Sequence, residues 1–179
     1  MSLFTSLPPY RRPRPIQQLI RALMLDRTLY EEVAVDRTGL SQALGVVVLA
    51  GIAKGVSLTA IPGLVGALFG IFVSVVGWIV LSALTFAIGN WVLRSGPSSW
   101  RAIAACLGFA DVPAVLNFLD VIPWAGPFVR MIVWFWLFAA TIVAARAAFR
   151  VSLARGAAIG GLGFIAYMVI GFVVEIWSS

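Results

Sequence analysis

The side chains that could do chemistry in this sequence lie inside or beside long apolar runs: Lys54, Asp111, Asn117, Asp120 and Arg130. A charged side chain in the middle of a bilayer costs at least about 2.5–3.5 kcal/mol, so each needs a partner, a cavity or a proton. Asp111 is expected near mid-bilayer, and two interpretations of it stay open. It is a proton or ion site, or its carboxylate bonds backbone groups that Pro113 leaves unpaired.

Two ion pairs are predicted among these residues. Asn117 and Asp120 share one helix face, and Asp120 is close to Arg130 across the turn "PWAGP", so an interfacial pair is expected there. Lys54 lies in the outer half of the first apolar run. Its long side chain reaches outward to the interface or pairs with Asp111.

Enzymatic chemistry has little support in the composition. The sequence contains no His, the usual general base and commonest metal ligand. The one Cys, Cys106, forms neither an intrachain disulfide nor a Cys-based zinc site. Asp111 and Asp120 would lie roughly 180° apart on a straight α-helix, which rejects an aspartyl protease pair. We therefore expect no catalytic residue, no metal site, no cofactor and no enzymatic activity.

The composition points to a membrane protein. Of 179 residues, 61% are hydrophobic and 11% charged, and the mean hydropathy is +1.02. A soluble domain is about half apolar and about a quarter charged. A transmembrane helix needs about 20 apolar residues, and five runs meet this need, so we predict an all-α bundle of five transmembrane helices at residues 40–60, 68–93, 102–122, 128–148 and 157–177.

Three segments make up the expected domain organisation. Residues 1–15 form a Pro/Arg-rich cytoplasmic arm, and residues 39–179 form the five-span membrane domain. Between them, residues 16–38 alternate apolar and charged residues at helical spacing, which predicts amphipathic helices lying on the membrane surface. Thr28 and Glu31 have the spacing of a capping box, so a second short helix is expected to start at Thr28. Binding of a partner protein is the alternative role for this segment.

The distribution of basic residues predicts the topology. Eleven of the thirteen Lys and Arg residues fall on one side if the chain has five spans, and only Lys54 and Arg130 lie towards the other. Positive residues are retained in the cytoplasm. The N-terminus is therefore expected inside and the C-terminus outside, in a cytoplasmic (cell) membrane.

Small residues recur at four-residue spacing in the expected spans. Gly51 and Gly55 form one such pair, and Gly66 and Gly70 form another. In lipid, small residues let helices approach closely. These pairs predict compact packing of the bundle and only weakly favour dimerisation.

The third apolar run carries a recognisable motif. In "LGFADVPAVL", Gly108 and Phe109 are followed closely by Pro113. With five expected spans and a polar N-terminal segment, this pattern resembles the Yip1 family, and "LDRTLYEEVAVDRTGLSQALGVVVLAGIAKG" resembles the entry of bacterial Yip1-like proteins into their first span. The resemblance covers nearly all of the chain after the arm. Family members usually have an uncharged residue where this chain has Asp111.

The resemblance implies a five-span fold and a role without catalysis. Eukaryotic members act in membrane trafficking and associate with small prenylated GTPases. This chain has "DRTLYEE" where those members carry "DLYGP", which argues against GTPase binding.

The function expected from the sequence is a non-enzymatic, Yip1-like integral membrane protein that scaffolds a membrane complex or serves as its accessory subunit. The alternative is a small transporter, or an ion- or proton-conducting protein, that uses Asp111 and Lys54. Membrane lipids, other membrane proteins or further copies of this chain are the expected partners, and nucleic acid is not one. A water-accessible cavity that reaches Asp111 favours transport, and a dry bundle with an exposed face of small residues favours assembly.

Overall fold

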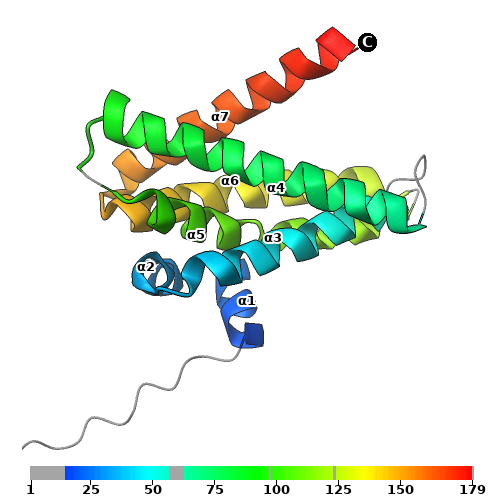
Figure 1. Ribbon diagram of the computed structural model, residues 1–179, viewed down its shortest axis with the longest axis horizontal. Coiled ribbons are helices and arrows are strands. Elements are labelled where there is room, and N and C mark those ends of the chain that lie inside the picture. Colours follow the sequence, from blue (N-terminus) through cyan, green and yellow to red (C-terminus); the bar gives the residue numbers. More distant parts are fainter. Residues whose placement is uncertain (1–14, 57–62, 97, 123, 179) are drawn as a thin grey trace, which may run out of the picture.

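The computed structural model describes residues 15–56, 63–96, 98–122 and 124–178 (Figure 1). This part of the chain is helical and has no strand. Its elements in chain order are α1 (Pro15–Leu23), α2 (Arg27–Val35), α3 (Gly39–Val56), α4 (Gly63–Ala87), a π-helix η1 (Ile88–Val92), α5 (Trp100–Ala110), a 3-10 helix η2 (Val112–Val121), α6 (Gly126–Phe149) and α7 (Leu153–Ser178).

Five helical segments in the described part of the chain are long and apolar enough to cross a membrane, which confirms the expected all-α class. They are Gly39–Val56, Gly63–Val92, Trp100–Val121, Gly126–Phe149 and Leu153–Val173. The second span begins at Gly63, five residues before the predicted start at residue 68. The predicted arm, except for Pro15, and the last four residues of the predicted first span lie outside the described residues.

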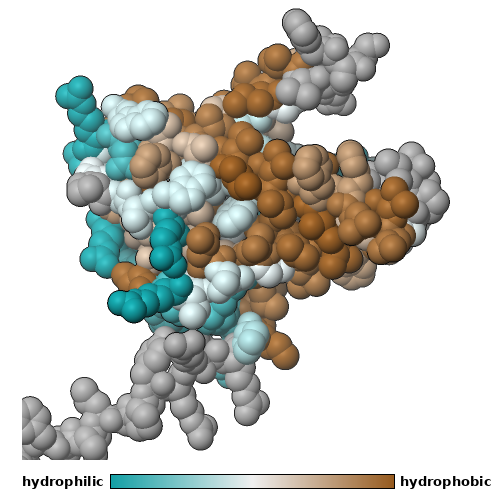
Figure 2. Space-filling model, in the orientation of Figure 1, coloured by the Kyte–Doolittle hydropathy of each residue, from teal (hydrophilic) through white to brown (hydrophobic). Residues whose placement is uncertain are grey.

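The surface divides into an apolar region and a hydrophilic end. In Figure 2 the hydrophilic residues gather at the end of the molecule that carries α2, and apolar residues cover much of the surface beyond it. Such an apolar surface suits a protein whose long helices are solvated by lipid tails. The multi-pass membrane class follows from these helices and this surface.

The predicted small-residue pairs bring α3 and α4 into close contact. A Cβ atom on Gly51 would lie 2.6 Å from the Cα of Ile71, and one on Gly70 would lie 2.6 Å from the Cα of Gly55. A Cβ on Gly55 would overlap the carbonyl oxygen of Gly66. These positions need Gly because backbone faces backbone. The small residues are therefore used within the bundle, as the sequence predicted.

The last helix contacts the bundle with only part of its length. At the beginning of α7, a Cβ on Gly156 would lie 2.6 Å from the Cβ of Arg146 of α6, and one on Gly160 would lie 2.8 Å from the carbonyl oxygen of Thr141. Further along, residues 168–173 are all exposed. Figure 1 shows this part of α7 extending away from the other helices.

The helices α1 and α2 form a hairpin, called here the N-terminal hairpin (residues 15–36), that docks into the bundle. Leu29 and Tyr30 of α2 are fully buried and pack against α5 and α6. The Cys106 thiol donates a hydrogen bond to the carbonyl oxygen of Tyr30 at 3.3 Å, and the indole N–H of Trp136 donates one to the carbonyl oxygen of Leu23 at 3.0 Å. Burial raises the pKa of the Tyr30 hydroxyl.

This docking corrects the expected role of the segment. The sequence placed its apolar face against lipid, but α2 buries that face against protein. Ile16 and Ile20 of α1 are exposed, as is Met24 directly after it, so lipid contact stays a prediction for α1 alone. The predicted start of the second helix at Thr28 was also wrong, because α2 begins at Arg27 and its N-cap is Asp26. The Asp26 carboxylate accepts a hydrogen bond from the Thr28 N–H at 2.9 Å. The capping box at Thr28 is not used as the start.

Arg21 holds the hairpin together through a small ion network. Its guanidinium contacts the Asp26 carboxylate at 2.7 Å and the Glu32 carboxylate at 3.0 Å, and it donates to the Thr28 hydroxyl at 2.8 Å. Hydrogen bonds to Glu32 and Asp26 raise the pKa of Arg21. The network thus links α1 to the N-terminus of α2 and to Glu32 in its second half.

Candidate functional site

The third span is broken at Asp111. Its first part, α5, ends at Ala110, and Asp111 has φ −82° and ψ −2°. The chain then continues as a 3-10 helix with Pro113 near its start. Pro cannot donate the backbone hydrogen bond that would continue the α-helix, and mid-helix stretches of 3-10 helix often mark functional hinges. The third span therefore has a joint at Asp111, beside the residue Pro113 for which the sequence predicted unpaired backbone groups.

Close packing on one side fixes this joint. A Cβ on Gly108 would lie 2.5 Å from the Cβ of Ala43 in α3, so α3 and α5 meet at this glycine. Phe109 is only 1% exposed and belongs to the core. The predicted motif residues Gly108 and Phe109 therefore position the joint and do not line the site.

The 3-10 geometry puts four residues in one row. A 3-10 helix has three residues per turn, so side chains three apart eclipse one another. Asp111, Ala114, Asn117 and Asp120 follow this spacing, and all four line the same cavity. The expectation that Asp111 and Asp120 lie on opposite faces was wrong, because it assumed an α-helix throughout. A 3-10 helix rises about 2.0 Å per residue, so Asp111 and Asp120 are roughly 18 Å apart along the axis. At that distance the two carboxylates cannot share a proton.

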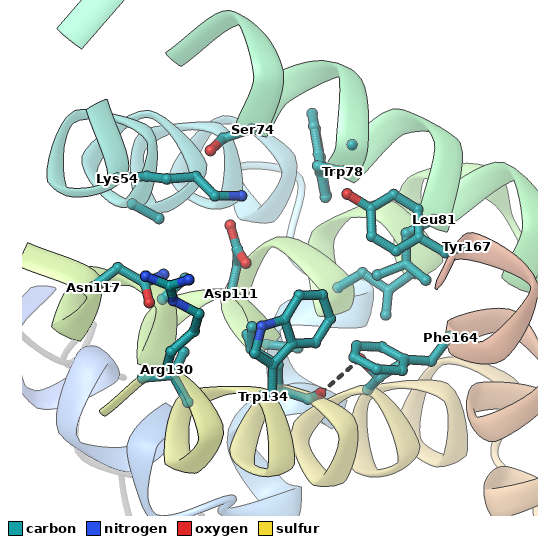
Figure 3. A pocket seen from close by; sticks show the side chains of 18 of the residues that line it. Lys54, Ser74, Trp78, Leu81, Asp111, Asn117, Arg130, Trp134, Phe164 and Tyr167 are labelled. Atoms are coloured by element: carbon teal, nitrogen blue, oxygen red, sulfur yellow. Dashed lines mark hydrogen bonds between the residues drawn. The ribbon is translucent and has the colours of Figure 1, made fainter. Parts of the chain in front are cut away.

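The row lines a cavity of about 390 Å³ to which all five spans contribute side chains (Figure 3). Ligand pockets fall in the range of about 300–1,000 Å³ and combine an apolar lining with a few converging polar groups. The cavity brings together all five ionisable and amide candidates from the sequence. They are Lys54 from α3, Asp111, Asn117 and Asp120 from the third span, and Arg130 from α6.

Lys54 and Asp111 face one another in the cavity. Figure 3 shows the Lys54 side chain pointing towards the Asp111 carboxylate, and the two opposite charges attract. The side chain of Asp111 makes no capping hydrogen bond to η2. The Asp111 carboxylate therefore does not cap η2, and Lys54 is the opposite charge that lies beside it (Figure 3).

Asp120 and Arg130 form the predicted ion pair. The Nη2 and Nε atoms of Arg130 donate to Oδ2 of Asp120 at 2.7 Å and 3.2 Å. The Asp120 side chain is 15% exposed and that of Arg130 is 61% exposed. The second carboxylate oxygen of Asp120, Oδ1, is buried and has no hydrogen-bond partner within the described residues. This atom lies against Gly126, where an added Cβ atom would come within 2.7 Å of it.

Aromatic side chains form the other side of the cavity. They are Trp78, Trp134, Phe164 and Tyr167. Trp134 and Phe164 meet edge to face with ring centroids 5.7 Å apart, and the Trp78 indole N–H donates to the carbonyl oxygen of Ala104 at 2.9 Å. These contacts fix the ring orientations, so the cavity has a rigid apolar wall.

Sequence reasoning missed this aromatic wall. Trp and Tyr are enriched at both membrane surfaces, so these residue types alone indicate an interface and not an internal site. Trp78 and Trp134 lie well inside their spans, and that departure from the interfacial positions was the signal available. Ser74 and Thr141, which also line the cavity, are too common in membrane helices to stand out.

The donor set does not resemble a metal centre. Across the residues that the structure describes, no three His, Cys, Asp or Glu side chains gather where they could hold a metal ion. The arrangement instead offers ammonium, guanidinium, carboxylate, amide and indole groups around one space. Such groups bind a polar solute by hydrogen bonds and charge.

The fold and the site define the class of this protein as a multi-pass α-helical membrane protein with a polar cavity among its spans. No protein-family model, no curated protein and no solved structure matches the chain. The resemblance to the Yip1 family, based on Gly108, Phe109 and Pro113, therefore stays a prediction.

Proposed function

We propose that this membrane protein binds a small polar solute in its internal cavity and moves it across the membrane. The observation that carries the proposal is the cavity itself, because residues of all five spans surround it and its charged side chains come from three of them. Intramembrane ionisable residues mark substrate or ion pathways by default. The sequence interpretation ranked scaffolding first, and the cavity at Asp111 reverses that order.

The energetic cost of a charge at Asp111 supports a role for this residue. Each charge inside a bilayer costs at least about 2.5–3.5 kcal/mol on insertion scales. Replacing a buried ion pair by well-packed apolar residues is often neutral or stabilising. Packing alone therefore gives no reason to keep Asp111 paired with Lys54 inside the bundle, whereas solute binding does.

Scaffolding stays the second candidate, and one observation favours it. The end of α7, residues 168–173, is exposed and extends away from the other helices (Figure 1), and such a helix could contact a partner. Against this, the small-residue pairs of α3 and α4 are already used inside the bundle. An exposed face of small residues was the feature expected of an assembly protein. A Yip1-like identity is compatible with either function.

The proposed orientation is that of the sequence, with the N-terminus inside and the C-terminus outside a cytoplasmic membrane. Eleven of thirteen basic residues on one side support it. A reporter active only outside, fused to the C-terminus, and a cytoplasmic reporter in the loop at residues 94–99 should both be active. A silent C-terminal reporter on a stable fusion would contradict this orientation.

Transport is tested with purified protein in liposomes. A panel of radiolabelled amino acids, organic acids and quaternary amines is offered outside, and a trapped pH-sensitive dye reports protons. We expect uptake above that of empty liposomes for at least one solute, and a loss of at least about tenfold in Asp111→Asn, since removing one buried charged contact costs about 1.5–3 kcal/mol. Glu31→Gln, which removes an exposed carboxylate outside the cavity, should leave uptake unchanged. No flux of any panel member from folded protein would overturn the proposal.

A further inference from the structure

The charges of the cavity balance. Two of its ionisable side chains are cations, Lys54 and Arg130, and two are carboxylates, Asp111 and Asp120. They are arranged as opposite pairs, one joined by the contacts of Arg130 with Asp120 and the other by the attraction between Lys54 and Asp111. The site thus presents both signs of charge and no excess of either.

The charged and apolar parts of the lining lie on different sides. Figure 3 shows Lys54, Asn117 and Arg130 on one side of the Asp111 carboxylate, and Trp134 and Tyr167 on the other. Trp is the aromatic ring that attracts a cation most strongly, within about 6 Å of its centroid. A cationic group bound near Asp111 would therefore meet a carboxylate and an aromatic face together.

A site with equal numbers of cationic and anionic side chains discriminates among solutes by their net charge. A solute with one net charge would leave that charge, or the partner that it displaces, without an opposite charge in the site, which is costly. A solute that carries one positive and one negative group avoids this cost. Its anionic group can take the place of Asp111 beside Lys54, and its cationic group can take the place of Lys54 beside Asp111.

We propose that the cavity takes a zwitterionic group, an ammonium and an anion joined by a short linker, with the apolar remainder of the molecule against the aromatic wall. This inference rests on the proposed function and names its substrate class. Lys54 binds the anion, and Asp111 binds the ammonium. A free amino acid or betaine carries this chemistry, and so does the ethanolamine headgroup of a phospholipid.

Matched analogues test the charge requirement on the unaltered protein. The thermal unfolding of the full chain is recorded in a non-ionic detergent with the protein amino acids, with glycine betaine, and with short-chain phosphatidylethanolamine. Each zwitterion that stabilises is compared with its ester, which keeps the cation only, and with its desamino acid, which keeps the anion only. For the phospholipid, the matched anion is short-chain phosphatidylglycerol.

The expected result is stabilisation by a zwitterion alone. A ligand at a hundred times its dissociation constant raises the melting temperature of a chain of this length by about 5–10 °C, and the single-charge analogues should give no more than a fifth of that shift. A response to the amino acids or betaine identifies a free solute, and a response to phosphatidylethanolamine identifies a headgroup. Equal shifts with a single-charge analogue, or no shift with any zwitterion, would overturn the inference.

A variant then tests whether Lys54 binds the anionic group of the zwitterion. Lys54→Met should weaken zwitterion binding at least tenfold, while Arg155→Met, an exposed basic residue at the start of α7, should not change it. The analogue comparison on the unaltered protein still decides the matter if Lys54→Met does not fold. Zwitterion binding without any flux would contradict transport and leave this inference intact. Flux of singly charged solutes only would contradict this inference and leave transport intact.

Discussion

Asp111 and Asp120 lie on one face of the third span and line the same cavity, although nine residues separate them. The cause is the 3-10 helix η2, which turns about 120° per residue instead of about 100°. Side chains at every third position then project in the same direction. This single change of helix type brings Asn117 and Asp120 into register with the break at Asp111 and creates the polar side of the site.

A cysteine scan tests this register. In a Cys106→Ala background, Cys at Ala114 and Asn117 should react with a water-soluble thiol reagent, because both positions line the cavity. Cys at Phe118, which is 49% exposed on the outer surface of the bundle, should react at least about tenfold more slowly, because lipid suppresses formation of the thiolate. The rate of labelling in membranes is the measurement. An α-helical pattern, with reaction at positions four apart instead of three, would contradict the 3-10 row.

The sequence predicted the features that depend on local chemistry. Apolar runs long enough to span gave the five helices, and Pro113 beside Asp111 gave the joint. It could not predict how far the 3-10 helix extends, because runs beyond three or four residues are uncommon and depend on tertiary contacts. The sequence did not predict that the N-terminal hairpin docks into the bundle, for the same reason. The face formed by Leu29 and Tyr30 is equally suited to lipid and to protein, so its partner depends on the assembled bundle.

The close contact of α3 and α4 gives a prediction on stability. Gly51→Ala would place a Cβ atom 2.6 Å from the Cα of Ile71, so the backbones must separate, and we expect a loss of about 1–3 kcal/mol in the free energy of unfolding. Gly45→Ala is the matched control in the same helix, because no atom lies within 4 Å of its added Cβ. Gly45→Ala should raise the free energy of unfolding by up to about 1 kcal/mol, because Ala has the higher helix propensity. Unfolding in detergent measures both, and equal effects would contradict the contact.

The N-terminal hairpin should loosen in acid. Hydrogen bonds from Thr28 and Arg21 lower the pKa of Asp26 below its ordinary value of 3.8. Because the folded state has the lower pKa, this carboxylate contributes its full stabilisation above about pH 3.8, and the contribution is lost as the pH falls through the folded value. Hydrogen exchange of residues 15–36 should therefore accelerate in that window by up to about fivefold, since an exposed pair is worth at most about 1 kcal/mol.

Two variants separate Asp26 from its surroundings. Asp26→Asn should abolish the acid dependence of exchange in the hairpin, while Glu31→Gln, which removes the exposed pair with Arg27 at 2.6 Å, should leave it in place. Acceleration of the same size in Asp26→Asn would mean that another group titrates. The experiment thus tests whether the Arg21 network, and not packing alone, holds α1 against α2.

The pairing of Lys54 with Asp111 predicts coupled effects on stability. Lys54→Met leaves the half-buried Asp111 carboxylate without its opposite charge, and breaking a buried pair in this way costs up to about 3–5 kcal/mol. Asp111→Asn leaves only the exposed Lys54 without its partner, so we expect a smaller loss of about 1 kcal/mol. The double variant should recover much of the loss, because replacing both members of a pair can be nearly neutral.

A double-mutant cycle in detergent measures this coupling. We expect a coupling energy of about 1–3 kcal/mol, the range of residues in direct interaction. The exposed pair of Arg27 and Glu31 is the matched control, and its coupling should not exceed about 0.5 kcal/mol. Strict additivity would show that Lys54 and Asp111 are not partners. If Asp111→Asn keeps the full stability and loses solute uptake, then the carboxylate serves the solute and not the fold, because only the loss of a ligand contact changes flux without changing unfolding.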